Sequence, residues 1–209
     1  MTTDPPTDDH IASAICSGST YEKVRYQRHA FLRQSVPRTL MLQSALLGLL
    51  VALLPMYGLF PASVAGYLPA TDPSVASPKV LLLGVFGGLL ELLGATLLVG
   101  TALYRVRRAP LTESQAHTML DVEDFARYVG LGTGGLAILL TVCVFAVGLG
   151  GGAAVDTYVG TAGANPFVAS GFGLPIVAVS LVAFVASVVL FYAGGYLSVR
   201  LSQARRRGN

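Results

Sequence analysis

The sequence predicts an all-α fold: a polytopic membrane protein whose four transmembrane helices form one bundle, with both termini cytoplasmic. Three observations predict it. Hydrophobic residues make up 53% of the 209 residues and charged residues only 12%, whereas about a quarter of the residues in a soluble domain are charged. Four apolar stretches are long enough to cross a bilayer core about 30 Å thick. The basic residues lie almost wholly in alternate connections between these stretches.

The expected spans are residues 40–60, 80–104, 128–149 and 173–199. Each is a continuous run rich in Leu, Val, Ala and Gly that exceeds the length of a strand, which favours a helix. The alternating segments of about ten residues that a transmembrane barrel requires do not occur in the sequence. We therefore divide the chain into an N-terminal arm, 1–38, a four-span domain, 39–200, and a basic tail, 201–209.

The distribution of Lys and Arg predicts the orientation. Thirteen of the fourteen lie in the arm, in the central connection 105–127 or at the C-terminal end, and Lys79 alone lies in the other two connections. Positively charged connections remain in the cytoplasm, so the prediction is N-in and C-in, with four spans. The preference for Arg over Lys, with abundant Ala, Gly and Val, is typical of a GC-rich prokaryotic genome. We therefore expect a prokaryotic plasma membrane.

Two cytoplasmic segments carry further local signals. In the arm, Tyr21, Val24, Arg28 and Phe31 recur at helical spacing, which is compatible with a basic helix at the headgroup level or with a solvated arm. Basic residues expected to contact anionic headgroups are Arg105, Arg107, Arg108, Arg205, Arg206 and Arg207.

The central connection is expected to be partly helical. Thr112 and Gln115 have the spacing of a capping box, so a short helix is predicted from there to Met119. Asp121 is expected to begin a second helix that leads into the third span.

Glu91 is the one ionisable residue inside an expected span. A charged group at that depth costs on the order of 2.5–3.5 kcal/mol on insertion scales, and such groups usually face the bundle or a cavity. Gly84, Gly88 and Ala95 share its helix face, so the sequence predicts that Glu91 lies at a helix–helix contact.

Two roles for Glu91 remain open. In the first, the neutral carboxyl donates a structural hydrogen bond; in the second, it exchanges a proton or cation in a transport path. The candidate hydrogen-bond partners are Gln43, Thr96, Thr141, Ser180, Ser187, Tyr192 and the Glu91 of a second copy.

Small residues on three spans predict close helix packing. They are Gly84, Gly88, Ala95, Gly130, Gly134, Ser180, Ala183, Ser187 and Gly194. The glycines of Gly130–Gly135 match the GxGxxG string, but a dinucleotide site needs a preceding strand within a βαβ unit, so we reject nucleotide binding. Their density is instead expected to weaken the helix locally.

The sequence contains no catalytic or metal-ligating motif, so we predict no enzyme activity, no cofactor and no metal, and no nucleic-acid binding. The leading hypothesis is a non-enzymatic accessory or scaffold subunit that packs through Gly and Ala faces. Its partners would be the lipid bilayer and either further copies of itself or other membrane subunits. The alternative is a small oligomeric transporter or channel that couples to protons or cations through Glu91.

Overall fold

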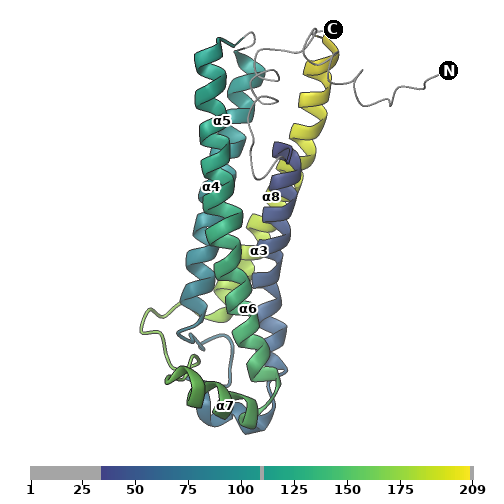
Figure 1. Ribbon diagram of the computed structural model, residues 1–209. Coiled ribbons are helices and arrows are strands. Elements are labelled where there is room, and N and C mark those ends of the chain that lie inside the picture. Colours follow the sequence, from purple (N-terminus) through teal and green to yellow (C-terminus); the bar gives the residue numbers. More distant parts are fainter. Residues whose placement is uncertain (1–33, 109–110, 208–209) are drawn as a thin grey trace, which may run out of the picture.

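The computed structural model describes residues 34–108 and 111–207 (Figure 1). All secondary-structure elements in these residues are helices. Four helices are long and apolar enough to cross a membrane. They are α3 (Val36–Gly58), α4 (Leu81–Arg107), the continuous helix Glu113–Leu149, and α8 (Ile176–Arg207). The predicted all-α fold with four candidate spans is therefore confirmed for the described residues.

The third span is longer than the sequence predicts. Its 37 residues comprise α5 (Glu113–Arg127), a π-helical segment η2 (Tyr128–Gly134) and α6 (Gly135–Leu149). The capping box at its start is confirmed, because Thr112 accepts a hydrogen bond from the backbone of Gln115 and Gln115 accepts one in return. The predicted second helix start at Asp121 is wrong. Neither Gly nor Pro occurs between Glu113 and Arg127, so nothing interrupts the helix there.

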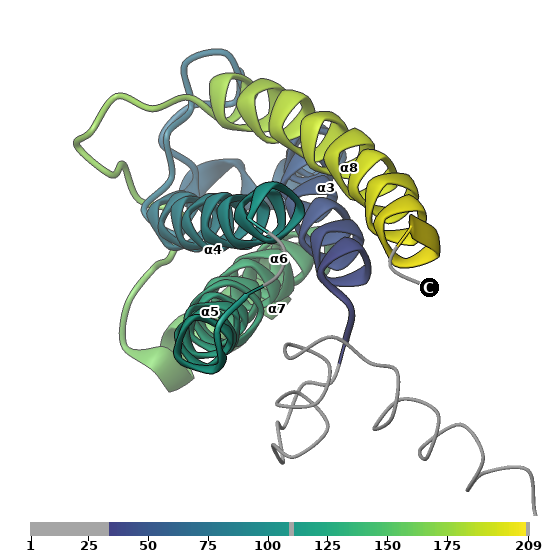
Figure 2. The same cartoon turned by 90° about the horizontal axis from the view of Figure 1, so that it is seen from above.

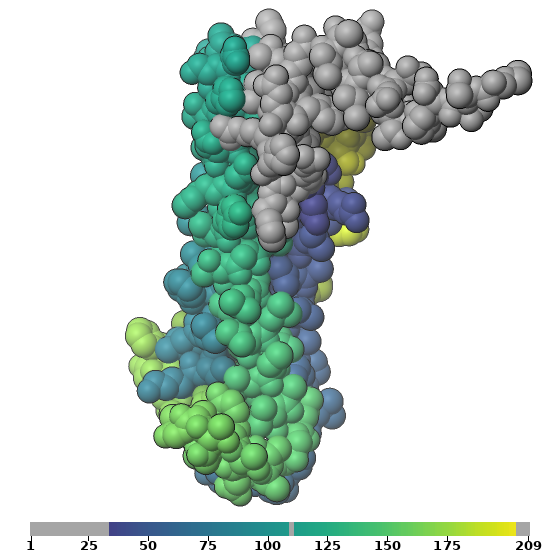
Figure 3. Space-filling model, viewed as in Figure 1, coloured from purple at the N-terminus to yellow at the C-terminus, as the bar shows by residue number. Residues whose placement is uncertain are grey.

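The helices form an elongated bundle in which α8 packs along α3, while α4 packs against α5, η2 and α6 (Figure 2). The start of α3, the end of α4, the start of α5 and the end of α8 lie toward the same end of the bundle (Figure 1). We call this the basic end, because Arg38, Arg105, Arg107, Arg108 and Arg200 lie near it. The space-filling view shows α7 at the opposite end (Figure 3).

We call that opposite end the capped end, and define it as residues 59–80 and 150–175. It contains a 3-10 helix, η1 (Ala62–Tyr67), and the helix α7 (Gly152–Ala162). The two connections are joined through their backbones, since Lys79 N–H donates to Val168 at 2.7 Å and Ser170 N–H donates to Ser77 at 2.8 Å. They form one cover over the bundle.

The helix α7 is not among the elements that the sequence predicts. Glycine has a low helix propensity, but here two glycines fix the helix boundaries. Gly151 precedes the helix with φ 82° and Gly163 follows it with φ 74°. Residues other than glycine rarely adopt such backbone angles.

The core lies between α3 and its neighbours. Leu40, Leu47, Leu50 and Leu53 form a buried stripe along α3. At the capped end the rings of Tyr57, Phe60, Phe145 and Phe167 pack with centroids 5.2–6.4 Å apart. Many exposed side chains of the four helices are large and apolar, among them Leu89, Leu139 and Val185, as is typical of membrane spans. This core holds the candidate site, which lies on α4 between the two ends.

Candidate functional site

Glu91 lies in the middle of α4 and is fully buried, with 0% of its surface exposed. It is ten residues beyond Leu81, the first residue of α4. At 1.5 Å per residue this is about 15 Å along the helix axis, or half of a hydrocarbon core about 30 Å thick. The carboxyl is therefore far from both ends of the span.

The face of α4 that carries Glu91 packs inside the bundle. Gly84 adjoins Leu50 of α3 and Thr141 of α6, and Gly88 adjoins Leu50 and Leu47. Ala95, one turn beyond Glu91, is also buried. All three small residues thus lie in the interior on the side of Glu91.

The closest contacts of α4 are with the π-helical segment and the end of α5. A Cβ added to Gly87 would lie 2.7 Å from the Gly134 carbonyl oxygen, and one added to Gly134 would lie 2.8 Å from the Gly87 carbonyl oxygen. A Cβ on Gly94 would lie 2.6 Å from the Ala126 carbonyl oxygen. Real Cβ atoms essentially never approach so closely, so only glycine fits at these three positions. The helices meet backbone to backbone beside Glu91.

Gln43 on α3 is the polar neighbour of Glu91, and it too is 0% exposed. Its side-chain Nε2 donates to the backbone carbonyl of Glu91 at 3.4 Å. The two carboxyl oxygens of Glu91 and the Oε1 of Gln43 are buried without a hydrogen-bond partner. The structure thus places Gln43 beside Glu91, but its amide bonds to the backbone and not to the carboxyl.

The other partners considered for Glu91 are engaged elsewhere. Thr96 donates to Leu92 and Thr141 to Ala137, each within its own helix. Tyr192 is 71% exposed on the outer surface of α8. A second copy could reach Glu91 only if the bundle opened, since no part of the side chain is exposed.

The small residues of α8 lie against α3. Ser180 donates to the Leu50 carbonyl at 3.2 Å, and Ser187 donates to the Ser44 carbonyl at 2.8 Å. Ala183 is buried between them in sequence, and a Cβ on Gly194 would lie 3.1 Å from the Pro37 carbonyl oxygen. This stripe joins α8 to the bundle and leaves Glu91 to other helices.

One glycine of the π-helical segment and the glycine that follows it, the first residue of α6, lie against the carboxyl of Glu91. A Cβ added to Gly130 would lie 3.3 Å from Oε2 of Glu91, and one added to Gly135 would lie 3.4 Å from Oε1. In an α-helix, residues five apart point about 140° away from one another, whereas i→i+5 bonding aligns them. The expected weakening of the helix at these glycines thus takes the form of a π-helical segment that surrounds the carboxyl.

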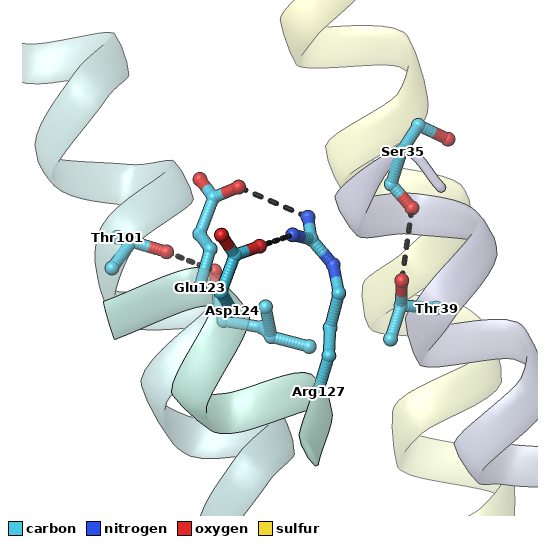
Figure 4. Close-up of polar contacts among 7 residues, drawn as sticks. Ser35, Thr39, Thr101, Glu123, Asp124 and Arg127 are labelled. Carbon is cyan, nitrogen blue, oxygen red and sulfur yellow. Dashed lines mark hydrogen bonds and ion pairs between the residues drawn. The ribbon is translucent and has the colours of Figure 1, made fainter. Parts of the chain in front are cut away.

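A buried ion pair lies near the end of α5, and the sequence analysis did not predict it. Arg127 is 4% exposed and donates to Glu123 at 3.0 Å and to Asp124 at 2.9 Å (Figure 4). Glu123 itself is 1% exposed. The sequence reading placed these residues in a cytoplasmic connection. Their i, i+4 spacing on one helix face with Leu120 and Ala126 was the available signal.

The basic residues at the end of α4 differ in exposure. Arg107 and Arg108 are exposed, Arg105 is partly buried, and the guanidinium of Arg108 lies 5.8 Å from the centre of the Tyr104 ring. The side chains of Arg205, Arg206 and Arg207 lie outside the described part of the chain, as does the predicted interfacial helix in the arm.

Within residues 34–108 and 111–207, no three His, Cys, Asp or Glu side chains lie close enough together to hold a metal ion. Comparisons with protein family models, with curated proteins and with solved structures find no match to this chain. What Glu91 and its surroundings do must therefore be argued from their geometry.

Proposed function

We propose that this chain is a multi-pass protein of a prokaryotic plasma membrane, with both termini cytoplasmic, that serves as a non-enzymatic accessory or scaffold subunit. The observation that carries the proposal is the direct backbone contact of α4 with the third span, at Gly87 with Gly134 and at Gly94 with Ala126. Small residues allow such close approach, and close approach is what holds helices together in lipid. The central face of the bundle is used for packing.

Charge supports the proposed orientation. In the described part of the chain, the only charged side chains of the capped end are Asp72, Lys79 and Asp156, whereas five arginines lie near the basic end. Positively charged segments remain on the cytoplasmic side. The basic end is therefore proposed to face the cytoplasm.

The surface of α8 is the proposed docking surface for a second copy of the chain or another membrane subunit. Only 22% of its apolar window is buried inside the bundle, compared with 39% for each of the other three spans. Its outward residues include Leu181, Val185 and Tyr192. Because α8 is the least buried of the four helices, it has the largest share of apolar surface available to a neighbouring protein.

Disulfide cross-linking in membranes tests this docking surface. In a chain whose native cysteines are replaced by serine, we expect Val185→Cys, at a side chain 60% exposed on α8, to form a cross-linked dimer. Leu89→Cys, at a side chain 61% exposed on α4, is the matched control, and Ala183→Cys tests a buried position on α8. Equal cross-linking at Val185 and Leu89 would mean random collision and would contradict the proposed self-association.

A second candidate function, a small oligomeric transporter or channel that couples to protons or cations, is favoured by one observation. Both carboxyl oxygens of Glu91 are buried without a hydrogen-bond partner, and intramembrane carboxyls often belong to ion pathways. It differs from the scaffold in predicting flux across reconstituted vesicles that Glu91→Gln abolishes.

A further inference from the structure

The polar atoms around Glu91 are unbalanced between donors and acceptors. Three buried oxygens lack a partner: Oε1 and Oε2 of Glu91 and Oε1 of Gln43. All three are acceptors, and an ionised carboxyl has no proton to donate. Buried polar groups in proteins almost always have a partner, and those that lack one call for an explanation such as a bound water or ion. What the site lacks is a donor or a positive charge.

Apart from the Gln43 amide, which donates to the backbone carbonyl of Glu91, nearby hydroxyl groups donate within their own helices. On α3, Thr39 donates to Ser35, and on α6, Thr141 donates to Ala137. On η2 the adjoining positions Gly130 and Gly134 carry no side chain, and neither does Gly135 at the start of α6.

Several charged and titratable groups on the helices packed against α4 are exposed or bonded to other residues. On α5, Arg127 donates through its two terminal nitrogens to Glu123 and Asp124, while its buried Nε has no hydrogen-bond partner. On α6 and α8, Cys143, Tyr192, Tyr196 and Arg200 are exposed, as is Arg38 on α3. Tyr57 of α3 is buried at the capped end, where it donates to Ala70. None of these groups pairs with the Glu91 carboxylate, so within this set its negative charge has no compensating positive charge.

We propose that the Glu91 carboxyl and the Gln43 side-chain oxygen form a site for one exchangeable monovalent cation, either a proton or Na⁺. The carboxylate carries one negative charge and the amide is neutral, so the site balances one positive charge. A divalent ion would leave it with one uncompensated positive charge. Hard oxygen ligands suit both a proton and an alkali cation. Gly130 and Gly135 pack closely against the carboxyl, since an added Cβ would lie 3.3 Å and 3.4 Å from its two oxygens.

Carboxyl infrared difference spectroscopy of the full chain in phosphatidylglycerol–phosphatidylcholine vesicles tests this site. The pH is varied between about 5 and 9, across the range in which perturbed carboxyls titrate, once with choline and once with Na⁺ as the only added cation. We expect a protonated carboxyl band that disappears as the pH rises and that Glu91→Gln removes. Glu113→Gln, at an exposed position in the first turn of α5, is the control that leaves the band in place.

The two buffers distinguish the two ions. If Na⁺ occupies the site, the band disappears at a lower pH in Na⁺ than in choline, because the cation competes with the proton. If the proton is the ligand, the two titrations coincide. A Glu91 band that stays constant over the whole range in both buffers overturns the proposal, and so does a titrating band that survives Glu91→Gln.

Gln43→Leu keeps the proposal testable if Glu91→Gln fails to fold, since it leaves the carboxyl in place and removes the neighbouring oxygen. We expect it to weaken cation binding on the order of tenfold, which corresponds to the loss of one good hydrogen bond. An unchanged titration in folded Gln43→Leu would remove Gln43 from the site. The cross-linking test does not involve either residue, so the scaffold role and this site can fail independently.

Discussion

At the scale of single residues, the absence of a side chain at two facing glycines is expected to stabilise the bundle. Gly87 and Gly134 each face the other's carbonyl oxygen at a distance that no Cβ can occupy. The obstacle is backbone rather than the end of a flexible side chain, so the helices themselves would have to move apart. Forcing extra atoms into a packed core typically costs about 1–3 kcal/mol.

We therefore expect Gly87→Ala or Gly134→Ala to lower the free energy of unfolding by about 2 kcal/mol. Gly100→Ala, also on α4, is the matched control, since no atom lies within 4 Å of an added Cβ there. On helix propensity that change should stabilise the protein by up to about 1 kcal/mol. Steric trapping in bicelles measures all three, and equal effects at Gly87 and Gly100 would contradict the close contact.

The buried ion pair of α5 gives a second prediction at this scale. Replacing Arg127 by Met leaves the buried Glu123 carboxylate without its arginine, and breaking such a pair typically costs about 3–5 kcal/mol. The double variant Arg127→Met with Glu123→Leu should recover most of that loss, because an apolar pair needs no compensating charge. Unfolding of both variants and of Arg108→Met, an exposed control, is measured under the same conditions. A double variant as unstable as Arg127→Met would show that Arg127 acts through other contacts.

At the scale of helices and segments, three of the four candidate membrane-spanning helices are predictable from the sequence and the third span is predictable only in part. The existence and approximate positions of α3, α4 and α8 follow from long apolar runs, which in lipid leave a helix as the available structure. Their exact bounds do not, since α3 begins at Val36 and α8 continues to Arg207, beyond the predicted spans. The third span was predicted to begin near Tyr128, because hydropathy falls at the charged residues before it. Its helix begins at Glu113, since charge on one face does not stop a helix whose other face packs against α4.

The candidate site was predictable only in part, for a geometric reason. Glu91 is conspicuous in the sequence as an acid within an apolar run, and the small residues of its own helix follow from a period of 3.6. Its neighbours on other helices do not, because Gln43 is 48 positions away and its contact depends on how α3 rotates about its axis. The π-helical segment also has no simple sequence signature, although its glycines indicated a weak helix.

At the scale of the whole molecule, helix length and charge together place the bundle in the bilayer. The helix Glu113–Leu149 has 37 residues, or about 55 Å at 1.5 Å per residue, against a hydrocarbon core of about 30 Å. If the capped end lies at one surface, the first turns of α5 project into water at the other. The arginines near that end are the basis for the proposal that it faces the cytoplasm.

Single-cysteine labelling of intact cells tests this placement. In a chain whose native cysteines are replaced by serine, Thr161→Cys at the end of α7 should react with a membrane-impermeant maleimide from outside, because Thr161 is exposed at the capped end. Ser114→Cys, exposed in the first turn of α5, should react only after the membrane is opened. The reverse pattern would invert the protein and contradict the charge argument. Protection of both positions in opened membranes would instead show that the first turns of α5 do not project into water.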